Sequence, residues 1–440
     1  MEIQRPLDLL HYQQLRYPQA AALVSRRQMS WHSYSTEACL SAINRVSAGL
    51  LSRGLERGDR AAILATRGSP RWYFLDLGLQ QIGVVVVALP AQAERGTLQA
   101  ILHETSAKYC FAEDRSTYEL IESIIAHLPE LRSVFTLENT AEDLPGWSEL
   151  VREPTEVHLE TIQSLRAAIH EDDLAAIAYT AGRPRAPKGV MLSHKNIVSN
   201  LRGLLEVLPI NCDKKALSIH PPNYMPERLL VYAYLAAGVS VYFGSGETAF
   251  FEEIREVQPH YLAASPRLPA HIHDHFAEHA ARLPFLRRQI AQWALTSGKH
   301  FREDRPLSLW SWLRNWVADL LVYRRWRARL GGWLEGGVIT GGPLPPELGR
   351  LFSAAGIELR EGYGLTEATA LVTLNRFTPG ACRFGTAGLP LPGVEVRIDT
   401  TNPQRPGELL IRGPQVMLGY YRPANSAATP SAAIWLKTGD

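Results

Sequence analysis

Cysteine is scarce in this chain. Its 440 residues include four cysteines, and these lie far apart with no Cys-x-x-Cys pair: Cys39, Cys110, Cys212 and Cys382. A disulfide framework needs cysteines crowded into a short secreted chain, and a cysteine zinc site usually contains closely spaced pairs. The sequence therefore excludes both classes and predicts reduced thiols.

Long apolar runs and an excess of charge of one sign are also missing. No run has the roughly 20 apolar residues of a membrane-spanning helix, and residues 1–6 lack the apolar segment of a secretory leader. Lysine and arginine number 46 against 44 aspartate and glutamate residues, a balance that does not favour nucleic acid as a partner. We expect a cytoplasmic protein.

Short apolar runs alternate with helical patterns. We expect helices at 35–53, 72–81 and 97–104 and strands at 61–65, 84–89 and 109–112. This alternation is typical of a parallel, doubly wound sheet. A length of 440 residues with 46% hydrophobic residues predicts a globular protein of two or more domains.

The segment REGYGLTE at 360–367 breaks from an apolar run into Gly-x-Gly and then offers a hydroxyl and a carboxylate. Glycines let the backbone approach a nucleotide, Thr366 could donate to a phosphate, and Glu367 could hold Mg²⁺. A tight turn between a strand and a helix also contains glycines of this kind. This segment alone leaves both interpretations open.

Two further segments favour the nucleotide. YTAGRPRAPKGV at 179–190 stands between an apolar run and a helical pattern. A strand, a glycine-containing loop with a lysine and the start of a helix together can hold a polyphosphate. WLKTGD at 435–440 ends in Asp440, whose carboxylate could accept hydrogen bonds from ribose hydroxyls.

With these motifs the chain resembles the acyl-adenylate-forming superfamily, which includes acyl-CoA synthetases, firefly-luciferase-like enzymes and peptide-synthetase adenylation domains. The motifs follow the family's order over nearly the whole chain: YTAGRPRAPKGVMLSH at 179–194, GGPLPPEL at 341–348, EGYGLTE at 361–367, GELLIRGPQVMLGYY at 407–421 and KTGD at 437–440. Several separate motifs in order make a chance match very improbable.

The resemblance implies an α/β fold: two doubly wound, mostly parallel sheet subdomains flanked by helices plus a small antiparallel β subdomain, as in the large N-terminal domain of adenylate-forming enzymes. Short alternating runs at 394–398 and 408–412, separated by turn residues, independently predict the antiparallel part. We expect subdomains at 1–175, 176–375 and 376–440, with a basic, Trp-rich helical insertion at 275–335. In the family a mobile C-terminal domain follows the aspartate that matches Asp440, and we expect this chain to lack that domain.

The same resemblance implies roles for matching residues. Lys188, Thr366 and Glu367 would be catalytic, with Glu367 as the ligand of the metal ion. Tyr224, Gly341 and Gly364 would border the acyl substrate, although a tyrosine packed in the core would also explain Tyr224. The nucleotide would be bound by Thr180, Ala181, Gly182, Arg183, Gly189, Gly341, Gly342, Pro343, Glu361, Gly362, Tyr363, Gly364 and Asp440.

The loop at 180–189 departs from the family, which usually has a run of serine, threonine and glycine there. This chain has Arg183, Pro184 and Arg185 in the middle of the loop. Proline removes a backbone donor, while arginine adds positive charge. The added charge could compensate for the lost hydroxyls, or the stiffer loop could impair turnover.

Residues 282–329 form a basic block. Eleven basic residues face three acidic ones, a net charge of +8, and five tryptophans are interleaved with them. One interpretation is peripheral contact with an anionic membrane; the other is a helical insertion whose tryptophans pack on the body and whose arginines are solvated. The length of the block, together with Glu227 and Arg228, resembles the long-chain branch of the family.

The resemblance therefore implies an ATP-dependent, AMP-forming acid–thiol ligase: a long-chain fatty acid–CoA ligase that uses ATP, Mg²⁺ and CoA. One alternative is an acyl-AMP ligase that hands the acyl group to a carrier protein or another nucleophile. Another is a non-catalytic nucleotide- or acyl-binding homologue with an altered phosphate loop. The acyl chain length and a homodimeric state are left open.

Overall fold

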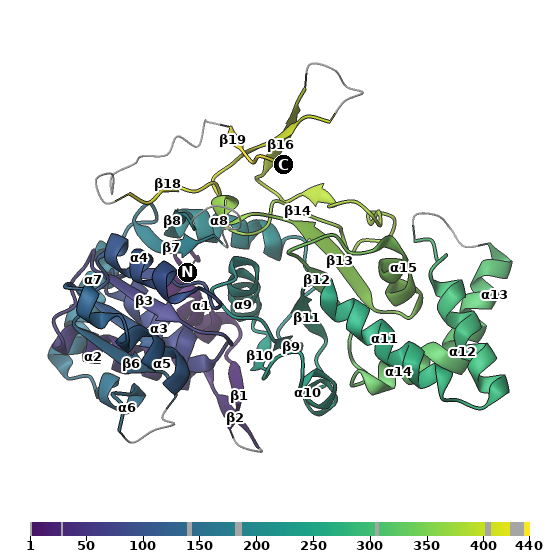
Figure 1. Ribbon diagram of the computed structural model, residues 1–440, viewed down its shortest axis with the longest axis horizontal. Coiled ribbons are helices and arrows are strands. Elements are labelled where there is room, and N and C mark those ends of the chain that lie inside the picture. Colours follow the sequence, from purple (N-terminus) through teal and green to yellow (C-terminus); the bar gives the residue numbers. More distant parts are fainter. Residues whose placement is uncertain are drawn as a thin grey trace.

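The structure, a computed structural model, describes residues 2–27, 30–138, 143–180, 187–303, 308–400, 406–422 and 435–440. It has two large sheets side by side, a small antiparallel sheet beside one end of both, and a helical lobe at the far end from the first sheet (Figure 1). This confirms the predicted α/β class with mostly parallel sheets and a small antiparallel part.

The first sheet has seven strands. Four of its six pairings are parallel, and β8 and β18 add an antiparallel edge through the other two. In spatial order the strands are β18 (Gly419–Tyr420), β8 (Gly189–Ser193), β7 (Leu174–Tyr179), β4 (Val85–Ala88), β3 (Arg60–Leu64), β5 (Tyr109–Ala112) and β6 (Ser133–Thr136).

The second sheet has nine strands, parallel in its centre and antiparallel at both edges. In spatial order the strands are β15 (Leu389–Pro390), β14 (Thr373–Leu374), β13 (Glu358–Tyr363), β12 (Gly336–Ile339), β11 (Tyr261–Ala264), β9 (Lys215–Ser218), β10 (Ser240–Phe243), β1 (Leu23–Arg27) and β2 (Ser30–Tyr34). The small sheet pairs β16 (Glu395–Asp399) with β17 (Glu408–Arg412) and β17 with β19 (Leu436–Lys437).

Helices connect the parallel strands, because a chain that returns to a parallel neighbour needs a long crossover connection. Their bounds are α1 (Leu9–Arg16), α2 (Thr36–Ser52), α3 (Pro70–Gln81), α4 (Arg95–Thr105), α5 (Arg115–Glu122), α6 (Trp147–Leu150), α7 (Glu156–Ala168), α8 (His194–Leu205), α9 (Met225–Ala237), α10 (Phe250–Val257) and α15 (Pro346–Ala354). The helices and strands predicted from the sequence are confirmed within two residues at each end. The helix predicted at 35–53 begins at Thr36, because Ser35 is its N-cap and accepts a hydrogen bond from the N–H of Ala38.

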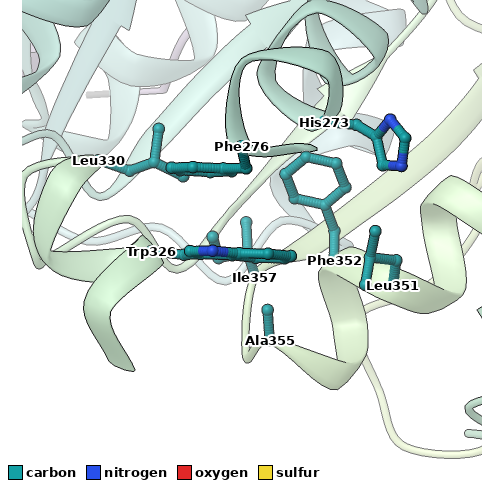
Figure 2. A pocket seen from close by; sticks show the side chains of 8 residues that line it. All are labelled: His273, Phe276, Trp326, Leu330, Leu351, Phe352, Ala355 and Ile357. Carbon is teal, nitrogen blue, oxygen red and sulfur yellow. The ribbon is translucent and has the colours of Figure 1, made fainter. Parts of the chain in front are cut away.

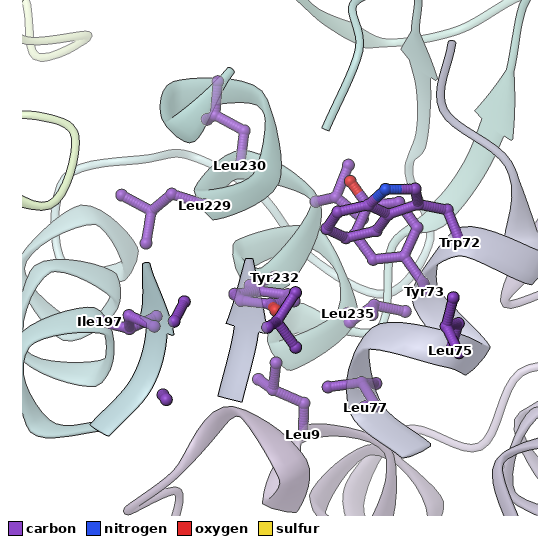
Figure 3. Packing of buried hydrophobic residues seen from close by; sticks show 14 of the residues in the cluster. Leu9, Trp72, Tyr73, Leu75, Leu77, Ile197, Leu229, Leu230, Tyr232 and Leu235 are labelled. Atoms are coloured by element: carbon purple, nitrogen blue, oxygen red, sulfur yellow. The ribbon is translucent and has the colours of Figure 1, made fainter. Parts of the chain in front are cut away.

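The main core joins the two sheets. Helices α3 and α9 pack together in this core with α1 (Figure 3). The same apolar cluster includes Ile63 of the first sheet and Val241 of the second. In both helices nearly every residue is buried. Close packing of the apolar side chains around these two helices holds the two sheets in a fixed relation. This relation positions the candidate residues described below.

A helical lobe follows β11. It consists of α11 (Arg267–Ala281), α12 (Phe285–Gly298), α13 (Leu309–Ala318), the π-helical turn η3 (Asp319–Tyr323) and α14 (Arg324–Arg329). In Figure 1 it occupies the end of the molecule opposite the first sheet. Among the described residues, no helix combines the length and the apolar character needed to cross a bilayer.

The strands before and after residue 175 do not divide cleanly between the two sheets. Strands β1 and β2 belong to the second sheet, although they precede the whole of the first, and β8 belongs to the first sheet, although it follows residue 175. The subdomain boundaries at 175 and 375 stay a proposal about units of the chain.

Candidate functional site

The candidate residues of the second sheet lie at the carboxyl ends of its parallel strands. Ile339 of β12 is paired with Glu361 of β13, so Gly341, which follows β12, and Gly362, near the end of β13, lie at the same edge of the sheet. Ligands of open α/β sheets bind outside this edge, because neighbouring connections diverge there and leave room. The sequence alone placed these residues in two separate motifs.

Gly341 and Tyr224 come together at this edge. Gly341 has a φ of +83°, and a Cβ on it would lie 2.7 Å from the hydroxyl of Tyr224. That hydroxyl donates to Oγ1 of Thr340 at 2.9 Å, and burial raises the pKa of Tyr224. Glycine is required here both for its backbone conformation and for the close approach of the tyrosine. Gly342 faces the ring of Pro266, and Pro343 is exposed beside it.

The turn after β13 is equally tight. A Cβ on Gly364 would lie 1.6 Å from the carbonyl oxygen of Ala370, so no larger residue fits. Gly362 is enclosed by Leu371 and Thr373. The turn leads into the short helix η4 (Thr366–Ala368), which presents Thr366 and Glu367 side by side and half-buried.

The first sheet contributes the connection between β7 and β8. The N–H of Thr180 donates to the carbonyl of Lys188 at 3.1 Å, and the N–H of Lys188 donates back to Oγ1 of Thr180 at 3.2 Å. Gly189 begins β8 against the ring of Tyr179. The connection is therefore closed at its base, with the Lys188 side chain exposed. Ala181, Gly182 and Arg183, together with Pro184 and Arg185, lie outside the described residues.

A capping box fixes the helix behind this connection. Ser193 accepts from the N–H of Asn196 at 3.1 Å, and Oδ1 of Asn196 accepts from the N–H of Ser193 at 2.9 Å. The free amide of Asn196 donates to the carbonyls of Pro414 and Val416 at 2.7 and 2.9 Å. Helix α8 thus holds the segment that leads into β18.

Tyr420 of β18 links the two halves of the site. Its hydroxyl donates to Oε1 of Glu367 at 2.9 Å, and the ammonium of Lys188 lies 4.5 Å from the centre of its ring. The N–H of Met417 also donates to the carbonyl of Glu367 at 2.8 Å. Burial, followed by the hydrogen bond to Glu367, raises the pKa of Tyr420 to about 12. At neutral pH the phenol is therefore a donor, and Lys188 and Glu367, far apart in the sequence, share one partner.

Asp440 approaches the same site from the small sheet. The hydroxyl of Tyr363 donates to Oδ2 of Asp440 at 2.6 Å, and this contact, together with burial, raises the pKa of Tyr363. The N–H of Leu409 donates to the carbonyl of Asp440 at 3.0 Å. The Asp440 carboxylate thus lies beside the last residue of β13, as a role on a nucleotide's ribose would require.

A buried polar group lies behind Tyr224, in the first turn of α9. Arg228 and Asp76 form a fully buried ion pair that also includes the hydroxyl of Tyr232. Glu227 accepts from the hydroxyl of Ser218, and burial raises the pKa of Glu227 to about 8. The pair resembling the long-chain branch is thus an internal feature that anchors α9, not a surface that meets substrate.

The residues present fit a magnesium nucleotide. Glu367 has one carboxylate oxygen bonded to Tyr420, and a carboxylate has further lone pairs for a hard cation. Lys188 supplies an ammonium, and Gly341 and Gly364 let the Tyr224 hydroxyl and the Ala370 carbonyl approach the ends of the strands. Among the described residues, no three histidine, cysteine, aspartate or glutamate side chains gather into an all-protein metal cage. The assignment of roles to these residues stays a prediction.

Sequence reasoning missed Tyr420 and Thr340. Tyr420 belongs to the motif GELLIRGPQVMLGYY, but a motif does not show which residue its tyrosine touches. The pairing of β18 with β8, Tyr420 opposite Val190, is what carries it to Lys188.

Two hollows lie elsewhere. One is small and apolar, beneath α11, α14 and α15, and is lined by His273, Phe276, Trp326, Leu330, Leu351, Phe352, Ala355 and Ile357 (Figure 2). The other is an open depression that includes Glu335 and Glu358. Ile357, Glu335 and Glu358 stand at the amino ends of β12 and β13, opposite the edge that carries the candidate residues, so neither hollow belongs to the site.

Comparison with known proteins gives consistent results. The family described as AMP-binding enzyme matches residues 10–421. The long-chain-fatty-acid–CoA ligase FadD15 of Mycobacterium bovis is 29% identical over 412 residues, which cover 91% of this chain and 66% of that protein. The long-chain-fatty-acid–[acyl-carrier-protein] ligase AEE15 of Arabidopsis thaliana is 25% identical over 442 residues, covering 89% of this chain and 60% of that protein.

Among solved structures, the N-terminal domain of FACL13 from Mycobacterium tuberculosis superimposes with a TM-score of 0.70 and 19% identity, covering 100% of this chain and 96% of that one. At this identity the likeness establishes the fold alone. The chain spans slightly less than two thirds of the length of the curated relatives named above.

Proposed function

The chain belongs to the AMP-binding enzyme family, and we propose that it is the nucleotide-binding part of a ligase that activates a long-chain fatty acid with ATP and then forms its CoA thioester. The observation that carries the proposal is the meeting of Lys188 and Glu367 at Tyr420. The Lys188 ammonium lies 4.5 Å from the centre of the Tyr420 ring, and the Glu367 carboxylate lies 2.9 Å from the Tyr420 hydroxyl. A cation and a carboxylate placed in this way suit a ligand with adjacent phosphates and a divalent ion.

In the proposed first step a substrate carboxylate oxygen bonds to the α-phosphorus of ATP, and the bond to pyrophosphate breaks. Both reactants are anions, so the protein must offset charge and align them. Lys188 would bind the β- and γ-phosphates, and Thr366 would donate to the α-phosphate. A magnesium ion held by Glu367 would neutralise phosphate charge.

The remaining residues would position the two substrates. Glu361, Gly362 and Tyr363 would lie along the adenine together with Gly341, and Asp440 would accept from the ribose. Tyr224 would border the acyl carbonyl. The hydrogen bond from Tyr224 to Thr340 supports this role, because it orients the phenol at the strand edge.

In the second step the CoA thiolate would attack the acyl carbonyl, and AMP would leave. The relatives named as CoA ligases support CoA as the acceptor. The relative named as an acyl-carrier-protein ligase favours the alternative, in which the acyl group passes to a carrier protein. A non-catalytic nucleotide-binding homologue is the third candidate, motivated by Arg183, Pro184 and Arg185 in the loop. A homodimeric state stays a prediction.

The test is pyrophosphate release by the protein in the full length that its gene encodes. ATP and Mg²⁺ would be supplied with carboxylates from acetate to palmitate and an aryl acid, with and without CoA. Release that peaks with long chains and rises with CoA is the expected result. Release that does not rise with CoA but rises with an unacylated carrier protein, whose free thiol can accept the acyl group, would favour the carrier ligase. No release from folded protein that still binds ATP would favour the non-catalytic homologue.

A further inference from the structure

The helical lobe turns an apolar stripe toward solvent. In α13 the only buried residue is Ala318, and Asn315 donates to the carbonyl of Ala354, so these two residues mark the side that faces the body. Six apolar residues of α13 and the start of η3 are between 39% and 79% exposed, four of them opposite that side and Trp310 and Trp312 flanking these four: Leu309, Trp310, Trp312, Leu313, Trp316 and Leu320. We call these six residues the outer stripe.

The spacing of the outer stripe is helical. Leu309, Leu313, Trp316 and Leu320 follow one another at intervals of four, three and four, which places them along one line of a helix. In a globular protein such a line normally faces the core. Phe285 and Leu286, at the start of α12, are also apolar and exposed, at 68% and 71%. Apolar surface gathered in this way marks an interaction site.

The other tryptophans separate the two interpretations of residues 282–329. Trp326 packs on the body, stacked on Phe276 with ring centres 4.8 Å apart (Figure 2). The outer stripe contains three of the other four, and Trp293 is 39% exposed on α12. Packing on the body therefore accounts for one tryptophan of the five.

The block at 282–329, which contains the stripe, is positively charged. The two described acidic residues of the block are bound by arginines of the protein: Glu303 by Arg360, at 2.9 and 3.0 Å, and Asp319 by Arg327. Exposed arginines occur on the helix that carries most of the stripe and on the helices next to it in the chain: Arg287 of α12, Arg314 of α13, and Arg324 and Arg325 of α14. Two copies of the chain that met through this face would bring these like charges together, and this repulsion disfavours self-association.

We propose that the outer stripe and its arginines form a docking surface for an anionic lipid bilayer. Tryptophan and leucine would enter the boundary between headgroups and acyl chains, and the arginines would bind lipid phosphates. This surface is inferred from exposure and charge alone and goes beyond the proposed ligase chemistry. It would place the enzyme where a fatty substrate partitions.

The lobe is also fastened to the candidate site. Arg360, which binds Glu303 through both carboxylate oxygens, is buried in β13 and directly precedes Glu361. A docked lobe would therefore be held rigidly against the strand that carries the nucleotide-binding residues.

The experiment is co-sedimentation with vesicles of phosphatidylcholine alone or with about 30% phosphatidylglycerol. We expect binding to the anionic vesicles that about 0.5 M salt weakens, with a blue shift of tryptophan fluorescence. The double variant Leu313→Asp/Trp316→Asp and the double variant Arg324→Glu/Arg325→Glu should each lower the partition coefficient roughly tenfold or more. The matched control is Trp333→Asp, which changes a tryptophan that is 60% exposed outside the lobe and should bind like the unaltered protein.

Thermal unfolding and ATP binding of each variant show that the fold and the candidate site are intact, so a failure of docking is distinguishable from a failure of the proposed ligase function. Equal binding to neutral vesicles, an equal loss in Trp333→Asp, or no binding at all would overturn the proposal. Concentration-dependent dimerisation that the stripe variants abolish, without vesicle binding, would assign the surface to a second copy instead.

Discussion

The hydroxyl of Tyr420 donates a hydrogen bond of 2.9 Å to the carboxylate of Glu367. The ring of the same tyrosine lies 4.5 Å from the ammonium of Lys188. Lys188 follows the loop after β7, and Glu367 follows the turn after β13, so a third element, β18, holds together the ends of two different sheets. Tyr420 therefore contacts both candidate residues, and we predict that it positions them.

Replacing Tyr420 by phenylalanine keeps the ring under Lys188 and removes the donor to Glu367. Partners that orient a metal-binding carboxylate typically contribute 10- to 100-fold to metal affinity or activity. We expect Tyr420→Phe to raise the Mg²⁺ concentration for half-maximal adenylation roughly tenfold with little change in the KM for ATP. Tyr420→Leu, which also removes the ring, should raise the KM for ATP as well.

The control for this pair is Tyr421→Phe. Tyr421 is the next residue, and its side chain belongs to a different apolar cluster, because neighbouring residues of an extended segment point to opposite sides. An equal change in Mg²⁺ dependence in Tyr421→Phe would show that Tyr420 acts through general stability only.

Lys188 is exposed, so its removal should leave the fold unchanged and affect only charge at the site. Removing one preorganised charge-stabilising group typically lowers kcat by about 10²- to 10³-fold, and we expect a loss of that order for Lys188→Ala in ATP–pyrophosphate exchange. Lys188→Arg should recover part of it, since it keeps the charge in a different geometry. Lys195→Ala is the matched control: Lys195 forms an exposed ion pair with Glu171 at 2.8 Å, and its loss should not change exchange.

Gly364 tests the tight turn after β13. Because a Cβ there would lie 1.6 Å from the carbonyl oxygen of Ala370, Gly364→Ala must displace backbone, and we expect a loss of about 3–5 kcal/mol in the free energy of unfolding. Gly96→Ala in α4 is the control. Nothing lies within 4 Å of its added Cβ, so it should be neutral or stabilise by up to about 1 kcal/mol. Urea unfolding measures both, and equal effects would contradict the geometry.

Glu227 should make stability depend on pH. Burial raises its pKa from 4.5 to about 8, so between these values the folded state holds a proton that the unfolded state releases. The stability is therefore fully present below about pH 4.5 and falls as pH rises toward 8, by at most about 1.4 kcal/mol per pH unit.

Glu227→Gln has no carboxyl group to titrate at this position, and its amide oxygen can still accept from Ser218. We expect the variant to match the unaltered protein near about pH 5 and to exceed it near about pH 7.5 in urea unfolding. An unchanged difference between the two proteins across this range would contradict the prediction.

The sequence by itself determined the class of fold and the identity of most candidate residues. Alternating apolar runs and helical patterns gave β3, α3 and β4, because a parallel strand buried on both faces must be continuously apolar. Gly364 could be singled out in its Gly-x-Gly segment because close backbone approach leaves only one residue type, and Gly341 was singled out by the resemblance to the family. Both kinds of signal are local, so they survive without knowledge of the neighbours.

Only the tertiary structure decided which of these residues meet. Tyr420 reaches Lys188 and Glu367 through the pairing of β18 with β8, and Glu303 reaches Arg360 across the edge of the second sheet. The sequence could not show that α13 turns its apolar line outward, because periodicity fixes which residues share a face and not which neighbour that face finds. Contacts between distant segments depend on how whole elements pack, and packing is a property of the assembled fold.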